Sequence, residues 1–165
     1  MLSMVEAALK ISNYTIDHAT LMRILDLGKE MLEKPIELLP DVESTLSALK
    51  GRYKLILATK GDLLDQERKL EKSGLSNYFN QIEILSDKQV KNYSDLIDQL
   101  EIDPSEFLMV GNSLKSDVLP LLELGAKAIH IPFHTTWAHE LVDVGTAQQP
   151  YDTINRLKTV VSYLE

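Results

Sequence analysis

The stretch FLMVGNSLKSDVLPLLELGA, from Phe107 to Ala126, indicates how this chain folds. An apolar run over 107–110 stops at Gly111, a polar turn follows, and a helical apolar pattern then runs to Gly125. Short apolar runs bounded by turn residues are typical of buried strands, and a glycine after a periodic segment is typical of a helix end. The stretch therefore predicts a strand, a turn and a helix, with Asp117 in the first turn of that helix.

The same alternation recurs from Pro40 onward. Apolar runs predict strands over 53–59, 81–85, 107–110 and 127–131. Periodic segments predict helices over 41–50, 63–72, 93–100, 114–124 and 154–164, with a loop over 142–151. Strands that alternate with helices of about ten residues are typical of right-handed βαβ units. The fold class is therefore α/β with a parallel sheet.

Residues 1–38 differ from the rest because they are helical in pattern throughout. A break is expected at Ser12–Tyr14, Asp17 is a candidate N-cap for the second helix, and Pro35 ends that helix. We therefore divide the chain into a helical segment, 1–38, and an α/β core, 39–165.

Composition excludes several classes of partner. The 165 residues carry a net charge of −8 and no cysteine. The negative charge argues against a nucleic-acid or membrane partner, and the lack of cysteine excludes disulfides and thiolate metal sites. There is no apolar run of membrane-spanning length and no signal-peptide pattern. These features fit a cytoplasmic protein.

Ligands of parallel α/β sheets bind at the carboxyl ends of the strands, where this chain carries polar residues. Asn112 and Asp117 offer an amide oxygen and a carboxylate at one strand end, which are ligands that suit Mg²⁺. The alternative is structural, with Asn112 as a turn residue and Asp117 complementing the helix dipole. Spacing alone leaves both interpretations open.

A phosphate site is a second hypothesis for these strand ends. Thr59, Lys60 and Gly61 form a strand-to-helix turn whose hydroxyl and backbone N–H groups can hold a phosphate oxygen. Lys91 follows the next strand and is a candidate to neutralise a phosphate, with Lys88 as a nearby competitor. The alternatives are an ordinary helix cap and solvated surface lysines. Residues 134–137 are expected to form a loop at the rim.

The order of these motifs resembles the haloacid dehalogenase (HAD) superfamily of hydrolases, and in particular a phosphatase-like subgroup with a helical cap. The resemblance rests on LPDVESTLSALKGRYKLILATKGD, residues 39–62, and VGNSLKSDVLPLLELGAKAIHIPFHTTWAHE, residues 110–140. It implies a three-layer Rossmann-like core over 39–165 and a remnant of the helical cap over 1–38. It also implies Mg²⁺ as cofactor and a small phosphorylated metabolite as substrate.

The resemblance assigns roles to individual residues. Thr59 would hydrogen-bond the phosphoryl group together with Lys60 and Gly61, and Lys91 would neutralise the phosphoryl group and the nucleophile. Asn112 and Asp117 would be the ligands of the metal. An Asn at position 112, where the family usually has Asp, keeps an oxygen ligand but removes one negative charge.

The larger difference between this sequence and the family concerns the nucleophile. It is the first Asp of a D-x-D motif at the end of a strand that precedes the cap and lies in the middle of the sheet, and this sequence contains no D-x-D. We therefore expect a truncated chain that starts inside the cap, lacks the first strand and has little activity alone. The alternative is a non-catalytic phosphate-binding or protein-interaction module, completed by a partner chain or in a homodimer.

Overall fold

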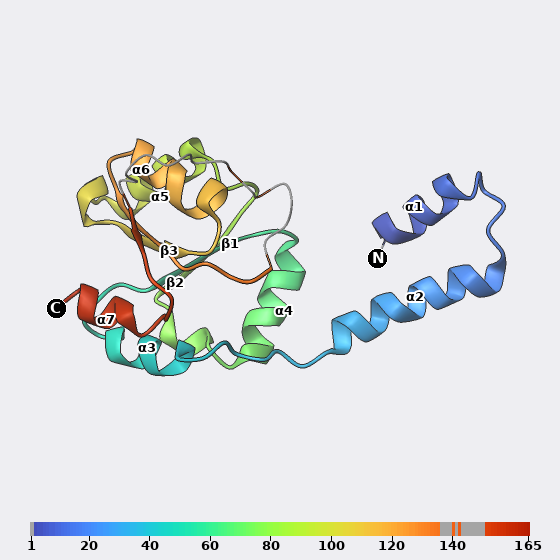
Figure 1. Ribbon diagram of the computed structural model, residues 1–165, viewed down its shortest axis with the longest axis horizontal. Coiled ribbons are helices and arrows are strands. Elements are labelled where there is room, and N and C mark those ends of the chain that lie inside the picture. The colour runs from blue at the N-terminus through green and yellow to red at the C-terminus, as the bar shows by residue number, and fades with distance from the viewer. Residues whose placement is uncertain (1, 136–139, 141, 143–150) are drawn as a thin grey trace. The chain divides into compact units, whose positions relative to one another are not determined.

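The computed structural model describes residues 2–135, 140, 142 and 151–165 (Figure 1). The chain divides into two compact units, Met1–Glu37 and Leu38–Glu165. This division lies close to the predicted boundary at residue 38, although the identity of the first unit as a cap remnant stays a prediction. Within the described ranges, none of the helices is long and apolar enough to cross a membrane.

The first unit is a pair of helices, α1 (Leu2–Ile11) and α2 (His18–Glu33), that contact each other. Between them, Asn13 and Tyr14 adopt left-handed backbone conformations with φ of 50° and 62°. The carboxylate of Asp17 accepts a hydrogen bond from a backbone N–H in the first turn of α2 at 2.9 Å. The predicted break and the predicted N-cap are therefore both confirmed.

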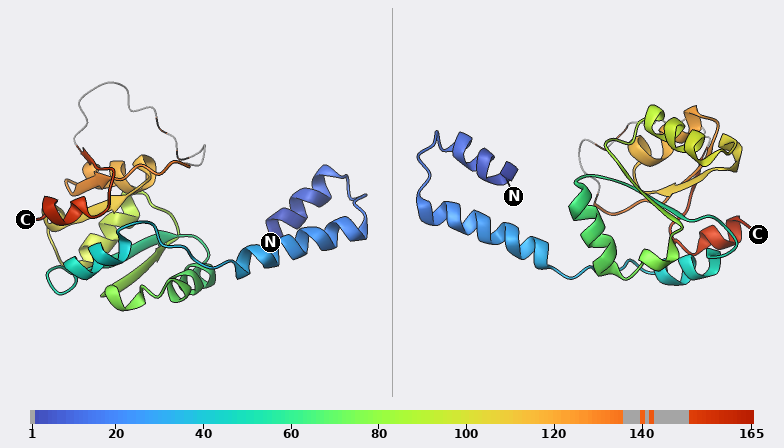
Figure 2. Two further views of the ribbon diagram at one scale, coloured as in Figure 1. Left: turned by 60° about the horizontal axis from the view of Figure 1, so that its bottom comes forward. Right: turned by 180° about the vertical axis from the view of Figure 1, so that it is seen from behind.

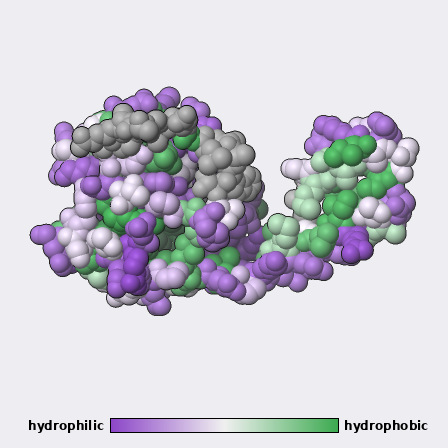
Figure 3. Space-filling view, in the orientation of Figure 1, coloured by the Kyte–Doolittle hydropathy of each residue, from purple (hydrophilic) through white to green (hydrophobic). Residues whose placement is uncertain are grey.

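Apolar side chains remain on the surface of this helical unit, as Figure 3 shows by hydropathy. Ile11 and Met31 are 84% and 64% exposed, while α2 buries Gly28. A helix pair with so little buried surface gains little stability from its own packing.

The second unit alternates strands with helices, as predicted. Its strands are β1 (Ile56–Lys60), β2 (Gln81–Leu85), β3 (Leu108–Gly111), β4 (Lys127–His130) and β5 (Asp152–Thr153). Its α-helices are α3 (Val42–Leu49), α4 (Leu63–Ser73), α5 (Val90–Leu100), α6 (Leu119–Glu123) and α7 (Thr159–Tyr163). Shorter helical turns occur at Ser76–Tyr78, Pro104–Glu106 and Leu114–Val118.

All strand pairs are parallel, and they form two sheets. β1 pairs with β2, and β4 lies between β3 and β5. Across the described part of the chain, no ladder joins the two sheets, so the second edges of β1 and β3 have no strand beside them. The parallel arrangement brings the carboxyl ends of the strands in each sheet to one edge.

Helices cover both faces of these strands (Figures 1 and 2). Neighbouring residues of a strand point to opposite faces. Ala128 of β4 accordingly packs with α5 and α6 in one apolar cluster, while Ile129 packs with α3 and α7 in another. Met109 and Val110 divide in the same way in β3. The α/β class with parallel strands and helices on both faces is confirmed.

The C-terminal region departs from the prediction. The helix predicted over 154–164 is limited to Thr159–Tyr163, and Asp152–Thr153 pair with β4 as β5. The N–H of Ile154 extends this pairing by donating to the carbonyl of His130 at 3.0 Å. The loop predicted over 142–151 lies outside the described residues except at its two ends.

Ile129 provides a test of this packing because it is fully buried beside Leu49 and Val160. We expect Ile129→Ala to lower the free energy of unfolding by about 2–5 kcal/mol through lost burial and a residual cavity. Ile82→Ala is the matched control, since Ile82 lies in β2 and is 44% exposed. Urea unfolding followed by circular dichroism measures both, and equal losses would contradict the position of Ile129 in the core.

Candidate functional site

The carboxyl ends of β1, β2 and β3 open onto one polar cavity of about 410 Å³. Its walls are formed by side chains of the strand ends and of the turns that follow, namely Thr59, Lys60, Gln66, Lys88, Asn112, Ser113, Ser116, Asp117 and Glu140. The cavity brings together four of the residues predicted to form a phosphate or metal site, which are Thr59, Lys60, Asn112 and Asp117.

Asp117 is folded back over the end of β3. Its backbone N–H donates to the carbonyl of Ser113 at 2.7 Å, and its Oδ2 accepts from the N–H of Ser113 at 3.0 Å. A Cβ atom at Gly111 would lie 2.4 Å from the side chain of Asp117, which is far inside van der Waals contact. Glycine is therefore required at position 111 because a carboxylate crosses directly above it.

Pro120 shapes the turn that carries Asp117. Proline has no N–H to donate to the carbonyl of Ser116, so regular helical hydrogen bonding cannot run through this point. The chain forms a wider π-helical turn over Leu114–Val118, in which the N–H of Leu119 donates to the carbonyl of Leu114. The buried hydroxyl of Tyr93 donates to the carbonyl of Ser116 at 3.0 Å and so replaces the missing partner.

Lys88 is the cation that contacts Asp117. Its Nζ lies 2.7 Å from Asp117 Oδ1, and the two side chains are only 12% and 7% exposed. The backbone N–H of Lys88 donates to the side chain of Asp87 at 2.8 Å, which fixes the turn after β2. An ion pair with so little access to water is costly to break, because removal of one partner leaves an uncompensated buried charge.

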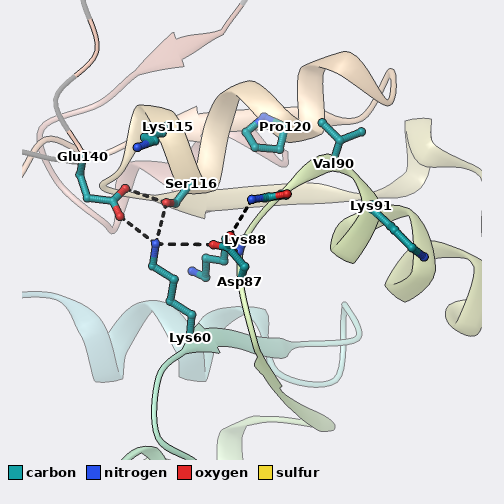
Figure 4. A pocket seen from close by; sticks show the side chains of 10 residues that line it. Lys60, Asp87, Lys88, Val90, Lys91, Lys115, Ser116, Pro120 and Glu140 are labelled. Carbon is teal, nitrogen blue, oxygen red and sulfur yellow. Dashed lines mark hydrogen bonds and ion pairs between the residues drawn. The ribbon is translucent and has the colours of Figure 1, made fainter.

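Lys91, which was predicted to neutralise a phosphate at these strand ends, is not brought to Asp117. Its side chain is 83% exposed and pairs with Asp95 at 2.8 Å, and Figure 4 shows it pointing away from Lys60 and Glu140. The reason is that α5 begins at Val90, three residues earlier than predicted, so Lys91 lies in the first turn on the solvent side. Lys88, the alternative that the sequence offered, lies beside Asp117 instead.

The turn after β1 holds its polar groups through internal contacts. Thr59 Oγ1 donates to Gln66 Oε1 at 3.0 Å, and Lys60 Nζ donates to Glu140 Oε1 at 2.8 Å. Gly61 has a φ of 136°, a conformation that favours glycine, but it is not among the residues that line the cavity. Thr59 and Lys60 thus face the cavity, and Gly61 shapes the turn behind them.

Glu140 is a site residue that sequence reasoning missed. It follows the expected rim loop at 134–137, of which Thr136 and Trp137 lie outside the described residues. Besides the contact with Lys60, its carboxylate accepts hydrogen bonds from the hydroxyls of Ser113 and Ser116. Burial raises the pKa of the Glu140 carboxyl, but the hydrogen bonds from Lys60 and the two serines lower it by a larger amount. The resulting pKa is about 2. The glutamate is therefore ionised. The sequence did not predict this residue because a single Glu in a loop gives no signal of such contacts.

A protein-family comparison decides the classification. The profile of the haloacid dehalogenase-like hydrolases matches residues 4–125, which is most of the chain. This chain belongs to the haloacid dehalogenase-like hydrolase family. The resemblance noted in the motifs at 39–62 and 110–140 is thus confirmed at the level of the family.

Individual relatives agree with this classification. The N-acylneuraminate-9-phosphatase of Rattus norvegicus is 28% identical over 115 residues, which are 67% of this chain and 44% of that protein. The human protein of the same name is 24% identical over 146 residues, which are 84% of this chain and 56% of that protein. The chain therefore spans about half the length of the curated relatives it matches.

A solved structure shares the fold over nearly the whole chain. A haloacid dehalogenase-like family hydrolase from Xanthomonas campestris superposes with a TM-score of 0.86 and 31% sequence identity. The alignment covers 99% of this chain and 69% of that one. The HAD-like, Rossmann-type architecture of the second unit is thus shown by a relative of known structure.

The difference between the two lysines can be tested through stability. Lys88→Met leaves the carboxylate of Asp117 buried without its cation, and we expect the free energy of unfolding to fall by about 3 kcal/mol. Lys91→Met removes the same charge from an exposed pair and should leave stability unchanged. Urea unfolding of both variants checks this, and a larger loss for Lys91→Met would contradict the placement of Lys88.

Gly111 provides a second test of the site's geometry. Gly111→Ala places a methyl group against the Asp117 side chain, so we expect a loss of about 1–3 kcal/mol in stability as that side chain is displaced. The variant should also shift the amide resonances of Ser113 and Asp117 in a ¹⁵N–¹H NMR spectrum. Unchanged stability and unchanged resonances would mean that Asp117 does not cross residue 111.

Proposed function

We propose that this chain forms part of the active site of a Mg²⁺-dependent phosphatase that acts on a small phosphorylated metabolite through an aspartyl-phosphate. The observation that carries the proposal is the cavity at the strand ends, in which the Lys88–Asp117 ion pair lies beside Thr59 and Asn112. A buried cation and a hydroxyl can bind a phosphoryl group, and two side-chain oxygen groups beside them can hold a Mg²⁺ ion that shares its charge.

Lys88 takes the role that the resemblance had assigned to Lys91. Lys88 is nearly buried, so its charge is weakly screened and can stabilise negative charge that develops on a phosphoryl oxygen. The hydroxyl of Thr59 would exchange its contact with Gln66 for one with the phosphoryl group. Lys60 and Gly61, which were also predicted as phosphate donors, belong to the same turn, but the Nζ of Lys60 is paired with Glu140 and Gly61 does not line the cavity.

Asn112 and Asp117 are the proposed ligands of the metal. Both line the cavity and both offer hard oxygen atoms, which fits the preference of Mg²⁺. Asp117 already uses its two oxygens for Lys88 and for the N–H of Ser113, which supports a contact with the ion through water. When bound, Mg²⁺ would neutralise charge on the phosphoryl oxygens.

The nucleophile of this reaction is not supplied by a D-x-D motif in the 165 residues. We therefore expect these residues alone to bind phosphate and to turn over little of any phosphate ester. Rapid hydrolysis of p-nitrophenyl phosphate by the purified chain, abolished by Asp117→Ala, would contradict this expectation and point to another nucleophile.

The names of the relatives favour phosphate ester hydrolysis over the release of halide. The rat and human proteins are named as phosphatases of an N-acylneuraminate 9-phosphate. Because this chain spans about half of their length, we carry over the class of reaction and leave the metabolite open. A cytoplasmic location is part of the same proposal.

A non-catalytic module is the second candidate function. The unpaired edges of β1 and β3 favour it, because an exposed strand edge is a surface to which another chain can add. A homodimer or a partner chain would then complete the sheet. Phosphate binding without turnover, even when the partner is present, would support this function over hydrolysis.

Phosphate binding is the experiment that tests the proposed site. We expect inorganic phosphate to bind the chain in the presence of Mg²⁺, and Lys88→Met to raise its Kd at least about tenfold through loss of a charge-assisted hydrogen bond. Thr59→Val should cause a smaller increase. Isothermal titration calorimetry measures both, with circular dichroism as the check on folding.

Lys91→Met is the control for that measurement, because it removes the same charge outside the cavity. Its Kd for phosphate should equal that of the unmodified chain. If Lys91→Met weakens binding while folded Lys88→Met does not, the role of Lys88 is wrong.

A further inference from the structure

The carboxylate of Glu140 is held by three donors from two parts of the second unit, the end of β1 and the turn after β3. Its Oε1 accepts from Lys60 Nζ at 2.8 Å, and its Oε2 accepts from Ser116 Oγ at 2.6 Å and from Ser113 Oγ. Lys60 closes β1, Ser113 follows β3, and Ser116 lies in the π-helical turn. One ammonium group and two hydroxyls therefore surround a single carboxylate.

These donors are positioned by contacts that do not involve Glu140. The hydroxyl of Ser113 accepts from the N–H of Ser116 at 3.0 Å, and the two serines are only 7% and 5% exposed. Lys60 Nζ also donates to Ser116 Oγ at 3.2 Å and lies 4.0 Å from a carboxylate oxygen of Asp87. The side chains of Lys60, Ser113 and Ser116 thus form a preorganised set of donors, which we call the anion cradle.

Glu140 lies where two cavities meet. The cavity with Thr59 and Asp117 adjoins a second one of about 420 Å³, drawn in Figure 4. Both cavities are lined by Lys60, Lys88, Ser116 and Glu140. The second cavity also has Lys91 and Lys115 in its walls, so its lining holds four lysines against the two carboxylates of Asp87 and Glu140. A ligand bound by its phosphoryl group in the first cavity would have the anion cradle within its immediate surroundings.

We propose that the anion cradle is a carboxylate-binding subsite, which Glu140 fills in the absence of ligand and gives up to a carboxylate of the substrate. This inference rests on the proposed phosphatase function and deepens it. The substrate class becomes a small phosphorylated carboxylic acid, bound by its phosphoryl group beside Lys88 and by its carboxylate between Lys60 and the two serines.

The chemistry of the cradle favours a carboxylate over a second phosphoryl group. The cradle provides partners for the two oxygens of one carboxylate. In Glu140, one oxygen accepts from the ammonium group of Lys60 and the other accepts from the two serine hydroxyls. A phosphoryl group would bring a third oxygen and more negative charge, which the carboxylate of Asp87, 4.0 Å from the Nζ of Lys60, would repel. An incoming carboxylate, in contrast, replaces an identical group, so Lys60 remains paired throughout the exchange.

The exchange has a cost that can be measured. An internal group that fills a subsite lowers the apparent affinity of a ligand in proportion to the fraction of molecules in which the subsite is open. Removing that group raises the affinity for ligands that use the subsite and leaves other ligands unaffected. Glu140→Gln keeps the size of the side chain and removes the charge that binds Lys60.

The experiment compares two probes by isothermal titration calorimetry in the presence of Mg²⁺. Phosphoglycolate carries a phosphoryl group and a carboxylate, whereas ethyl phosphate carries only the phosphoryl group. We expect Glu140→Gln to lower the Kd for phosphoglycolate about tenfold and to leave the Kd for ethyl phosphate unchanged. Adding Ser116→Ala to this variant should abolish the gain.

Glu123→Gln is the matched control, because Glu123 is exposed at the end of α6 and the change in net charge is the same. It should alter the affinity for neither probe. If Glu140→Gln weakens both probes, or strengthens both equally, Glu140 builds the cavity or acts only through net charge, and the subsite is overturned.

The two proposals fail in different ways. If ethyl phosphate binds but Glu140→Gln gives no gain for phosphoglycolate, the subsite alone is wrong. If ethyl phosphate does not bind the unmodified chain, the proposed phosphatase site fails and the substrate class fails with it.

Acetate provides a measurement that does not depend on phosphate. In Glu140→Ala, we expect acetate to enter the cradle and to shift the amide resonances of Ser113 and Ser116 in ¹⁵N–¹H spectra. The unmodified chain should show no such shifts at the same acetate concentration. Absence of shifts in Glu140→Ala would show that the cradle does not take a carboxylate and would overturn the inference.

Discussion

The nearly buried ion pair between Lys88 and Asp117 joins the two sheets of the second unit at their carboxyl ends. Lys88 comes from the turn after β2, and Asp117 from the turn after β3. The pair can form only because Gly111 leaves room for the aspartate to cross the end of its own strand. It also depends on Pro120, which has no N–H for the carbonyl of Ser116, so the residues before α6 form a wider π-helical turn that presents Asp117. Local backbone chemistry thus fixes the position of the site's central charge.

The cavity is organised by carboxylate–lysine pairs within the protein. Lys88 holds Asp117, and Lys60 holds Glu140, so each of these lysines already has an anionic partner. An incoming anion therefore gains only the difference between its own contacts and those that it displaces. The two pairs differ in whether an incoming anion can displace the carboxylate. The proposed metal site requires Asp117 to stay in place, whereas Glu140 can be replaced by an equivalent carboxylate. Selectivity would then follow from which pair a ligand exchanges with.

The sequence predicted those features that depend on local patterns. Apolar runs placed the four main strands, and Asp17 was identified as a helix cap because the side chain and the donors it satisfies are close in sequence. Thr59, Asn112 and Asp117 could be placed at strand ends because parallel strands share their polarity. The sequence could not decide which of Lys88 and Lys91 lies beside Asp117, because that depends on whether a residue precedes a helix or lies in its first turn, and helix starts are uncertain by a few residues. Glu140 and β5 depend on contacts with distant parts of the chain, for which local periodicity gives no signal.

The unpaired edges of β1 and β3 connect the fold to the chemistry. These edges belong to the strands that carry Thr59 and Gly111, so both lead to the same cavity. A parallel strand added along either edge would have its carboxyl end at this cavity, because strands of a parallel sheet end on the same side. Its last side chains would therefore meet Lys88 and Asp117, whichever chain or segment supplied them. An acidic residue there could act as the nucleophile, whereas an apolar residue would leave a binding site without turnover. The absence of a strand beside β1 and β3 among the described residues thus connects the completeness of the sheet with the proposed catalysis.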